Sequence, residues 1–267
     1  MYNLEIILNT KMSIFGNYAL YYDLLYQDKD YIGEADFIHR LISDNSCDVK
    51  SIFELGCGTG NHAVLLAEKG YQICGIDLSA DMLQLANNRT VKLPAEISSR
   101  LRFVQGDVRN IRVNEKFDVV TSLFHVVSYQ TTNSDLLDTF VTVREHLKLN
   151  GIFVFDVWYG PAVLSDRPAL RVKRLQNEKI EVTRIAEPVL HPNQNWVDVN
   201  YQIIVQNRLT GKVESIHENH RMRYLFQTEI EMLLQQAQME LIDCGEWMTS
   251  KELGFNTWSA YFVGRLK

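Results

Sequence analysis

Two kinds of hydrophobic periodicity alternate through the first 160 residues of the chain. Short apolar runs are typical of buried strands, and apolar residues spaced three or four apart are typical of helices. The predicted strands are 51–55, 72–77, 101–105, 117–124 and 151–158, and the predicted helices between them are 62–68, 80–88 and 133–147. Strands that alternate with helices indicate a parallel sheet wound in βαβ units.

The pattern changes on both sides of this unit. Helical spacing from residue 18 to 42 breaks near Asp28-Lys29-Asp30, which predicts two short helices. After Gly160-Pro161, residues 196–203 alternate between apolar and polar, and Thr210-Gly211 provides a hairpin turn before the next strand. This alternation is typical of antiparallel strands that have one solvated face.

We therefore predict an α/β fold in which a Rossmann-like seven-stranded sheet carries an antiparallel β insertion after its fifth strand. A helix at 228–238 and strands at 240–246 and 257–263 complete the sheet. The expected parts are an N-terminal helical lid (1–45), a cofactor-binding core (46–160 and 226–267) and the insertion (161–225), which would contact the substrate or a second subunit.

Charge and cysteine content narrow the range of partners. The 267 residues carry a net charge of -6 with no basic run, so we expect no nucleic acid partner. The four cysteines form no C-x-x-C pair, which favours a reducing, cytoplasmic setting and argues against a metal site. No apolar stretch approaches the roughly 20 residues of a membrane helix. A small-molecule substrate fits best.

The segment Glu54-Leu55-Gly56-Cys57-Gly58-Thr59-Gly60 joins a predicted strand to a predicted helix. A glycine turn at this point lets backbone N–H groups approach a ligand closely. Asn61 stands where a dinucleotide fold has its third glycine, and no lysine follows as in a phosphate-binding loop. Glu54 would repel a phosphate but suits a ligand with an ammonium group, such as S-adenosylmethionine.

Two later carboxylates fit the same cofactor. Asp77, at the end of the next strand, could accept both ribose hydroxyls, and Asp107 could accept from the adenine amino group. Leu78 and Met82 would sandwich the adenine ring. Each residue alone could instead be an ordinary turn or helix cap, but the three matches occur in order along one βαβ series.

With these motifs in place, the chain resembles the class I S-adenosylmethionine-dependent methyltransferases. It is most similar to the nucleotide-sugar N,N-dimethyltransferases of amino-sugar biosynthesis. The matching segments are Tyr22-Asp23-Leu24-Leu25-Tyr26, Lys29-Asp30-Tyr31, Glu34-Ala35, 54–60, Asp77-Leu78-Ser79, Asp81-Met82-Leu83, Gly106-Asp107 and Arg109.

The resemblance implies that N-terminal helices fold over the cofactor. It also implies that Tyr26 and Tyr31 face the active site and the methionyl carboxylate, which agrees with the affinity of aromatic rings for cations. The predicted cofactor contacts are Tyr26, Tyr31, Glu54, Gly56, Cys57, Gly58, Asp77, Leu78, Met82, Asp107, Val108 and Leu123.

An amine acceptor must lose a proton before its lone pair can attack the methyl group. His125 follows the fourth strand, where α/β sheets present ligand-facing groups, so we predict His125 as the base, acting with Tyr26. The alternative is a histidine that only contacts the ligands. The family tends to carry small hydroxyl residues here, so His125 is a departure from its pattern.

Two substrate contacts are expected as well. Trp158 could stack on a sugar or base, although it could equally be core. Arg174, in a cluster with Arg167, Arg171 and Lys173, could bind a diphosphate, although a solvated strand face is the simpler reading.

The leading interpretation is methyl transfer from S-adenosylmethionine to the amino group of a nucleotide-linked sugar. The alternatives are an O-methyltransferase acting on a small metabolite and a non-catalytic module that binds an adenosyl ligand. A homodimer is compatible with each of them.

Overall fold

The computed structural model describes residues 19–267, so the first eighteen positions of the expected lid lie outside the described residues. The lid's two helices are α1 (Ala19–Leu25) and α2 (Tyr31–Asn45), separated at the predicted break. Asp30 caps α2, because its carboxylate accepts a hydrogen bond from Gly33 N at 2.9 Å.

The central sheet has the predicted architecture. Its parallel strands run in the order β3-β2-β1-β4-β5, and β11 pairs antiparallel with β5 and β10 with β11. These strands are β1 (Ser51–Leu55), β2 (Gln72–Asp77), β3 (Leu101–Gln105), β4 (Phe117–Ser122), β5 (Leu147–Tyr159), β10 (Met239–Glu246) and β11 (Ser259–Leu266). The Rossmann-like prediction is therefore confirmed.

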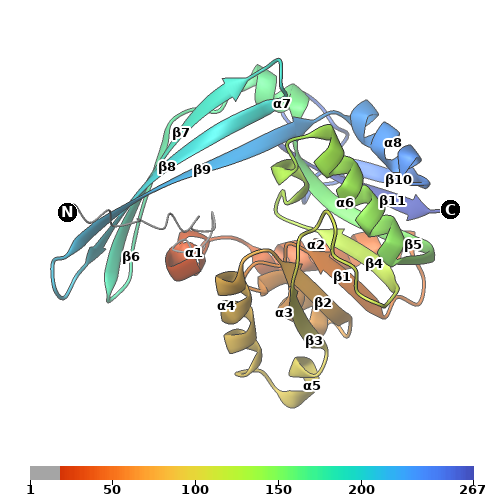
Figure 1. The fold of residues 1–267 in the computed structure, drawn as a ribbon, viewed down its shortest axis with the longest axis horizontal. Helices are drawn as coiled ribbons and strands as arrows, with labels where there is room; N and C mark the ends of the chain where they lie inside the picture. Colours follow the sequence, from red (N-terminus) through yellow and green to blue (C-terminus); the bar gives the residue numbers. More distant parts are fainter. Residues whose placement is uncertain (1–18) are drawn as a thin grey trace, which may run out of the picture.

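Helices cover both faces of this sheet (Figure 1). One apolar cluster joins one face to α2 and α3, and a second joins the other face to α6 and α8. The helices are α3 (Asn61–Glu68), α4 (Ala80–Thr90), α5 (Ala95–Ser98), α6 (Asn133–His146), α7 (Gly160–Ser165) and α8 (Gln227–Gln236), with a 3-10 turn η1 (Val127–Tyr129). The short elements α5, α7 and η1 were not predicted.

The insertion is a four-stranded antiparallel sheet, as its alternating sequence predicts. It contains β6 (Arg171–Gln176), β7 (Ile180–His191), β8 (Trp196–Asn207) and β9 (Val213–Leu225). The end of β9 pairs with the end of β5, where Trp158 lies opposite Tyr224, so the core sheet continues into the insertion.

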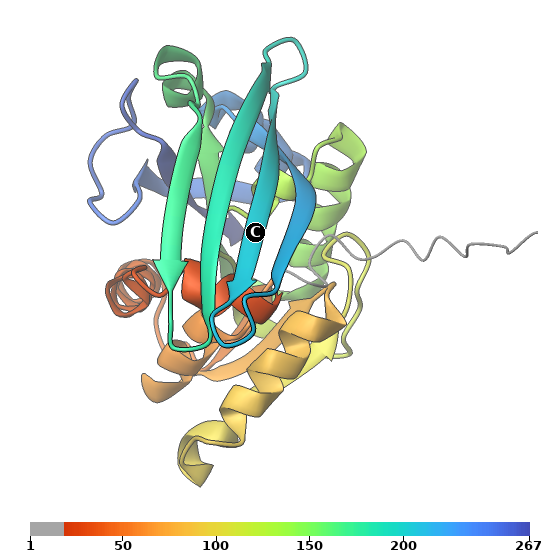
Figure 2. The same ribbon diagram turned by 90° about the vertical axis from the view of Figure 1, so that its left-hand side faces the viewer.

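The sheet of the insertion lies beside the carboxyl ends of the core strands (Figure 1), and Figure 2 shows α1 behind the lower part of its strands. Tyr21 and Leu25 of α1 pack against Val182 and Ile203 of the insertion in one buried cluster. The lid helix is therefore enclosed between the glycine turn of the core and the insertion. No helix within residues 19–267 is long and apolar enough to cross a bilayer.

Candidate active site

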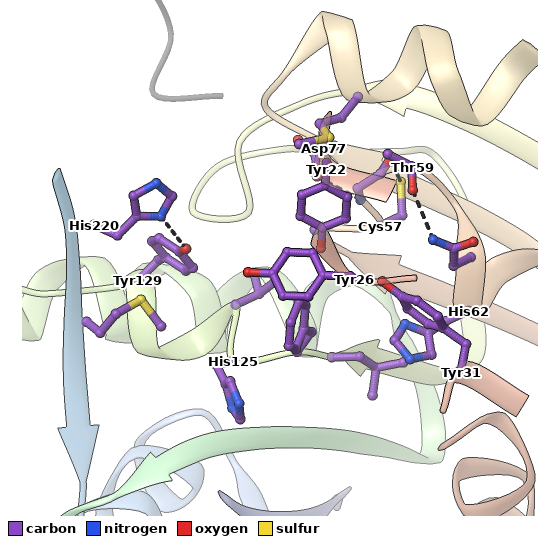
Figure 3. Close-up of a pocket in the computed structure, with 18 of the residues that line it drawn as sticks. Tyr22, Tyr26, Tyr31, Cys57, Thr59, His62, Asp77, His125, Tyr129 and His220 are labelled. Carbon is purple, nitrogen blue, oxygen red and sulfur yellow. Dashed lines mark hydrogen bonds between the residues drawn. The ribbon is translucent and has the colours of Figure 1, made fainter. Parts of the chain in front are cut away.

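A cavity of about 400 Å³ opens between the glycine turn, the lid and the insertion (Figure 3). It lies at the carboxyl ends of β1, β2 and β4, the position where α/β sheets bind ligands. Ten of the predicted site residues line it: Tyr26, Tyr31, Gly56, Cys57, Gly58, Asp77, Met82, Leu123, His125 and Trp158.

The glycine turn has a backbone that only glycine adopts easily. Gly56, Gly58 and Gly60 have φ of 72°, 54° and 76°, in the left-handed region. A Cβ on Gly56 would lie 2.5 Å from the side chain of Val126, so the turn also approaches the segment after β4 too closely for any side chain. The three glycines of G-C-G-T-G thus follow from the backbone conformation of the turn.

Asp77 is fixed at the end of β2 by this turn. Its two carboxylate oxygens accept hydrogen bonds from Gly58 N at 2.9 Å and Ser79 N at 2.8 Å. Burial raises the pKa of Asp77, although these bonds oppose the shift. Each oxygen keeps further lone pairs, so the carboxylate can accept from a diol that enters the cavity.

Glu54 lies behind the turn and does not line the cavity. Its side chain is 1% exposed, and its Oε2 has no hydrogen-bond partner within the described residues. Burial, together with the nearby charge of Asp77, raises the pKa of Glu54 to about 8. A cation or an N–H donor that comes within reach of Glu54 would stabilise the ionised form of this carboxyl.

Four other predicted contacts also lie outside the cavity lining. Leu78 is 61% exposed, and the carboxylate of Asp107 is held by the Arg109 guanidinium at 2.9 Å, which lowers the pKa of Asp107. Val108 packs against the core, and Arg174 is exposed on β6. Their contacts with ligands stay predictions.

The two lid tyrosines reach the cavity from the turn after α1 (Tyr26) and from the first position of α2 (Tyr31), as Figure 3 shows. The Tyr26 ring meets Phe124 edge to face at 5.0 Å, and Arg184 Nη1 donates to Tyr26 Oη at 3.2 Å. The Tyr31 ring lies 5.1 Å from that of His62, and burial raises the pKa of Tyr31 to about 12. The hydroxyl of Tyr31 therefore stays protonated at neutral pH, and both hydroxyls can donate to an anionic group.

A buried carboxylate that sequence reasoning missed holds the lid on the core. Glu34 of α2 contacts His62 Nε2 at 2.7 Å and Trp247 Nε1 at 3.3 Å, and it pairs with Lys29. Burial alone would raise the pKa of Glu34, but the bond from His62 and the charge of Lys29 lower it to about 2. A glutamate on the apolar face of a helix is the sequence signal that could have predicted this buried ion pair.

His125 is held by a second buried carboxylate, Asp156 of β5. The His125 backbone N donates to Asp156 Oδ1 at 3.1 Å, and Nδ1 lies 2.7 Å from Asp156 Oδ2. Phe124 and His125 have φ of 62° and 64°, so β4 ends early in a tight turn that aims His125 at β5. The missed signal was an aspartate inside the otherwise apolar run 152–159.

The insertion adds a third polar group to the cavity. Tyr129 Oη and His220 Nδ1 are hydrogen-bonded at 2.8 Å, and His220 Nε2 lies 3.1 Å from Glu218 Oε2. His220 is 3% exposed, and alternate residues of β9 bring Glu218, His220 and Met222 to one face. Strand alternation in 213–225 could have predicted this face.

A second cavity of about 650 Å³ continues from the first under the insertion. The two share His125, Trp158, Arg171 and Tyr201, and the second extends to Arg184, Lys173, Pro188 and Trp258. Of the arginines of this region, Arg171 lines both cavities and Arg184 lines the second, while Arg174 lines neither of the two. Within residues 19–267, no group of three or more His, Cys, Asp and Glu side chains is arranged to hold a metal ion.

Comparisons with known proteins agree with this geometry. Residues 52–151 match the family model of a methyltransferase domain. The chain is 28% identical over 203 residues to a dTDP-3-amino-3,4,6-trideoxy-alpha-D-glucopyranose N,N-dimethyltransferase of Streptomyces venezuelae, covering 75% of this chain and 82% of the relative. It is 25% identical to a dTDP-4-amino-2,3,4,6-tetradeoxy-D-glucose N,N-dimethyltransferase of Saccharopolyspora spinosa, covering 70% and 72%.

The fold has a close match among solved structures. An S-adenosylmethionine-dependent methyltransferase from Clostridium acetobutylicum superimposes with a TM-score of 0.78 at 24% identity, covering 95% of this chain and 99% of that one. The match includes the insertion as well as the core, given its coverage. Residues 52–151 therefore match a methyltransferase domain, and the chain has the fold of the S-adenosylmethionine-dependent enzymes, as its sequence predicts.

Proposed function

We propose that the enzyme transfers methyl groups from S-adenosylmethionine to the amino group of a nucleotide-linked sugar. The two curated relatives are named as N,N-dimethyltransferases of dTDP-amino sugars, and they differ in whether the amino group is at position 3 or 4. The shared chemistry is therefore a sugar amine attached to a nucleoside diphosphate, and the position of the amine on the ring is left open.

The residues around the glycine turn fit the cofactor. Glu54 offers an unpartnered carboxylate oxygen for the ammonium group of the methionyl tail, and Asp77 offers lone pairs to the ribose hydroxyls. Tyr26 and Tyr31 carry hydroxyls that can donate to the methionyl carboxylate. When bound, the cofactor supplies a methyl group that its positive sulfur already activates. The protein must then align the acceptor and accept its proton.

The pairing of His125 with Asp156 is the observation that carries the assignment to an amine. Asp156 Oδ2 lies 2.7 Å from Nδ1, a charge contact without the angles of a hydrogen bond, and the other ring nitrogen, Nε2, can accept a proton from the acceptor when it carries the lone pair. A protonated imidazole is then stabilised by the buried carboxylate. This arrangement serves a sugar ammonium group well, because the group must be deprotonated before it attacks.

The second cavity suits the nucleotide part of the substrate. Arg171 and Arg184 present guanidinium groups that can bind a diphosphate in a bidentate way, and Trp158 and Trp258 offer faces for stacking. Because His125 lines both cavities, a substrate that spans them would place its sugar between His125 and the cofactor.

We also propose a cytoplasmic setting and no metal requirement. All four cysteines are free thiols, which is typical of a reducing compartment. A homodimer and the absence of a nucleic acid partner remain expectations from the sequence.

The test is a paired incubation. The enzyme and S-adenosylmethionine are mixed with two dTDP-sugars that carry either an amino or a hydroxyl group at the same ring position, and products are identified by mass spectrometry. We expect one or two methyl groups on the amino sugar only. Methylation of the hydroxy sugar alone would show an O-methyltransferase, and no turnover of any acceptor would favour an adenosyl-binding module.

A variant pair tests the base. His125→Asn should lower kcat by at least about a hundredfold while leaving S-adenosylhomocysteine affinity within about threefold. His217→Asn, on the exposed face of β9, is the matched control and should behave as the wild type. A His125→Asn enzyme with wild-type kcat would remove this residue from the chemistry.

A further inference from the structure

Resting on the proposed amine chemistry, we propose that Tyr129, His220 and Glu218 form a second proton acceptor for the substrate amine, with Tyr129 as the group that touches it. Each methyl transfer to an amine releases one proton, and dimethylation releases two in succession. His125 and Tyr129 both line the same cavity, so the amine has two acceptors within one site.

The three side chains form a buried chain of hydrogen-bonding groups. Tyr129 comes from the turn after β4 and His220 from β9, as Figure 3 shows. Glu218 lies two residues before His220 on the same face of β9. Tyr129 Oη is 2.8 Å from His220 Nδ1, and His220 Nε2 is 3.1 Å from Glu218 Oε2. The side chains of His220 and Glu218 are 3% and 8% exposed, so bulk water does not compete for these bonds.

The carboxylate determines which imidazole nitrogen carries the proton. Glu218 has no proton to donate when it is ionised, so His220 Nε2–H donates to it. Nδ1 is then the acceptor, and the Tyr129 hydroxyl must donate to Nδ1. In this direction the Tyr129 oxygen donates to His220, and as a hydroxyl oxygen it can also accept an N–H from an amine in the cavity that it lines.

The transfer balances without any co-reactant. The substrate ammonium gives one proton to the Tyr129 oxygen while the Tyr129 hydroxyl proton passes to His220 Nδ1. The products are a neutral amine, an unchanged phenol and an imidazolium that faces the Glu218 carboxylate. Neutral amine and cofactor then react. When the products leave, the imidazolium proton passes back to the Tyr129 oxygen while the Tyr129 hydroxyl proton passes to water in the cavity.

The groups around Tyr129 favour this coupled proton transfer over the formation of a free Tyr129 phenolate. Tyr21 and Tyr22 face these side chains from α1 and Tyr26 from the turn after it. Tyr201 faces them from β8, Glu218 from β9 and the Arg184 guanidinium from β7. Burial and these neighbours raise the pKa of Tyr129 well above its ordinary value, with Arg184 opposing the shift. Because a lone phenolate is disfavoured, the proton from Tyr129 must move to His220 in the same step.

Two variants separate proton uptake from mere support of the fold. His220→Gln keeps an acceptor for the Tyr129 hydroxyl and a donor to Glu218 but cannot be protonated, and Tyr129→Phe removes the hydroxyl alone. His217→Gln, on the opposite face of β9, is the control. Initial rates on an amino-sugar nucleotide that the wild type methylates are measured across neutral and alkaline pH.

We expect both variants to lower kcat at neutral pH by at least about tenfold, with KM changed by less than about threefold. The deficit should shrink as the pH rises above the pKa of the substrate amine, because the amine then binds already neutral. Wild-type kcat in either variant, or a deficit that stays constant with pH, would overturn the proposal.

A second measurement does not depend on the acceptor. In protein with ¹⁵N-labelled histidine, NMR reports which ring nitrogen of His220 carries the proton, and His220→Gln identifies its signals. A proton on Nε2 supports the proposed direction, and a proton on Nδ1 overturns it. If the wild type methylates no amino sugar, the proposed function fails, while this measurement still decides the direction of the hydrogen-bond chain.

Discussion

The substitution Glu54→Gln measures how much the burial of an ionisable carboxyl without a bound cation lowers the free energy of unfolding. In the unfolded chain Glu54 ionises near its ordinary pKa of 4.5, whereas in the folded protein burial holds the proton until about pH 8. Since the folded pKa is the higher one, the wild type is most stable below pH 4.5 and loses stability as the pH rises towards 8.

The size of this loss of stability follows from the difference between the pKa values of Glu54 in the unfolded and folded states. At about 1.4 kcal/mol per pH unit, the interval from 4.5 to about 8 corresponds to an upper limit of about 5 kcal/mol. Glutamine does not titrate and has nearly the same shape. The free energy of unfolding of Glu54→Gln, relative to the wild type, should therefore rise by up to about 4 kcal/mol between about pH 5 and about pH 9.

Urea unfolding at several pH values measures this difference, with Glu252→Gln, an exposed glutamate, as the control. The same variant should bind S-adenosylhomocysteine at least about tenfold more weakly, because the amide cannot pair with the ligand's ammonium group. It should bind 5′-methylthioadenosine, which lacks the amino acid tail, as the wild type does. An unfolding difference that is the same at both pH values would refute the buried titrating carboxyl, and equal losses for both ligands would refute its pairing with the ammonium.

Three further variants test the remaining contacts. Asp77→Asn should weaken S-adenosylhomocysteine and 5′-methylthioadenosine equally, by at least about tenfold in calorimetry, since both carry the ribose that Asp77 would hold. Glu34→Gln should lower the free energy of unfolding by about 3 kcal/mol at pH 7, because it leaves His62 and Lys29 without their partner. This loss should shrink between pH 4.5 and about 2 in urea titrations, because the lowered pKa of Glu34 makes the wild type lose the same stabilisation there. Asp156→Asn should lower kcat by about a hundredfold or more with unchanged S-adenosylhomocysteine affinity, as steady-state rates and calorimetry would report.

The sequence predicted the core sheet because its signals are local. A glycine turn, an apolar run and a helical period each lie within about ten residues, and their order along the chain determines a βαβ series. The end of β4 was predicted two residues too late, since Phe124 has strand-forming chemistry but a φ of 62°. Its conformation is determined by contacts with Tyr26 and with the turn towards β5, which no local pattern records.

The same reasoning explains which site residues could be predicted. Gly56, Gly58 and Asp77 follow one another along adjacent core elements, so a motif identifies them. Tyr129, Arg184 and His220 meet only because the insertion folds back over the lid. Tyr129 and His220, for example, are 91 residues apart in the sequence. Hydrophobic periodicity predicts each strand but does not predict which side chains of distant strands come together.

The turn after β4 links backbone strain to the proposed chemistry. Two successive non-glycine residues in the left-handed region cost about 1 to 2 kcal/mol each, so Phe124 and His125 need compensating contacts. The hydrogen bond from His125 N to Asp156, and the packing of Phe124 on Tyr26, supply them. Asp156 is fixed in turn by the pairing of β5 with β11. Asp156 thus contacts both the imidazole and the backbone of His125. The same carboxylate that would support the chemistry of His125 therefore also stabilises the strained turn.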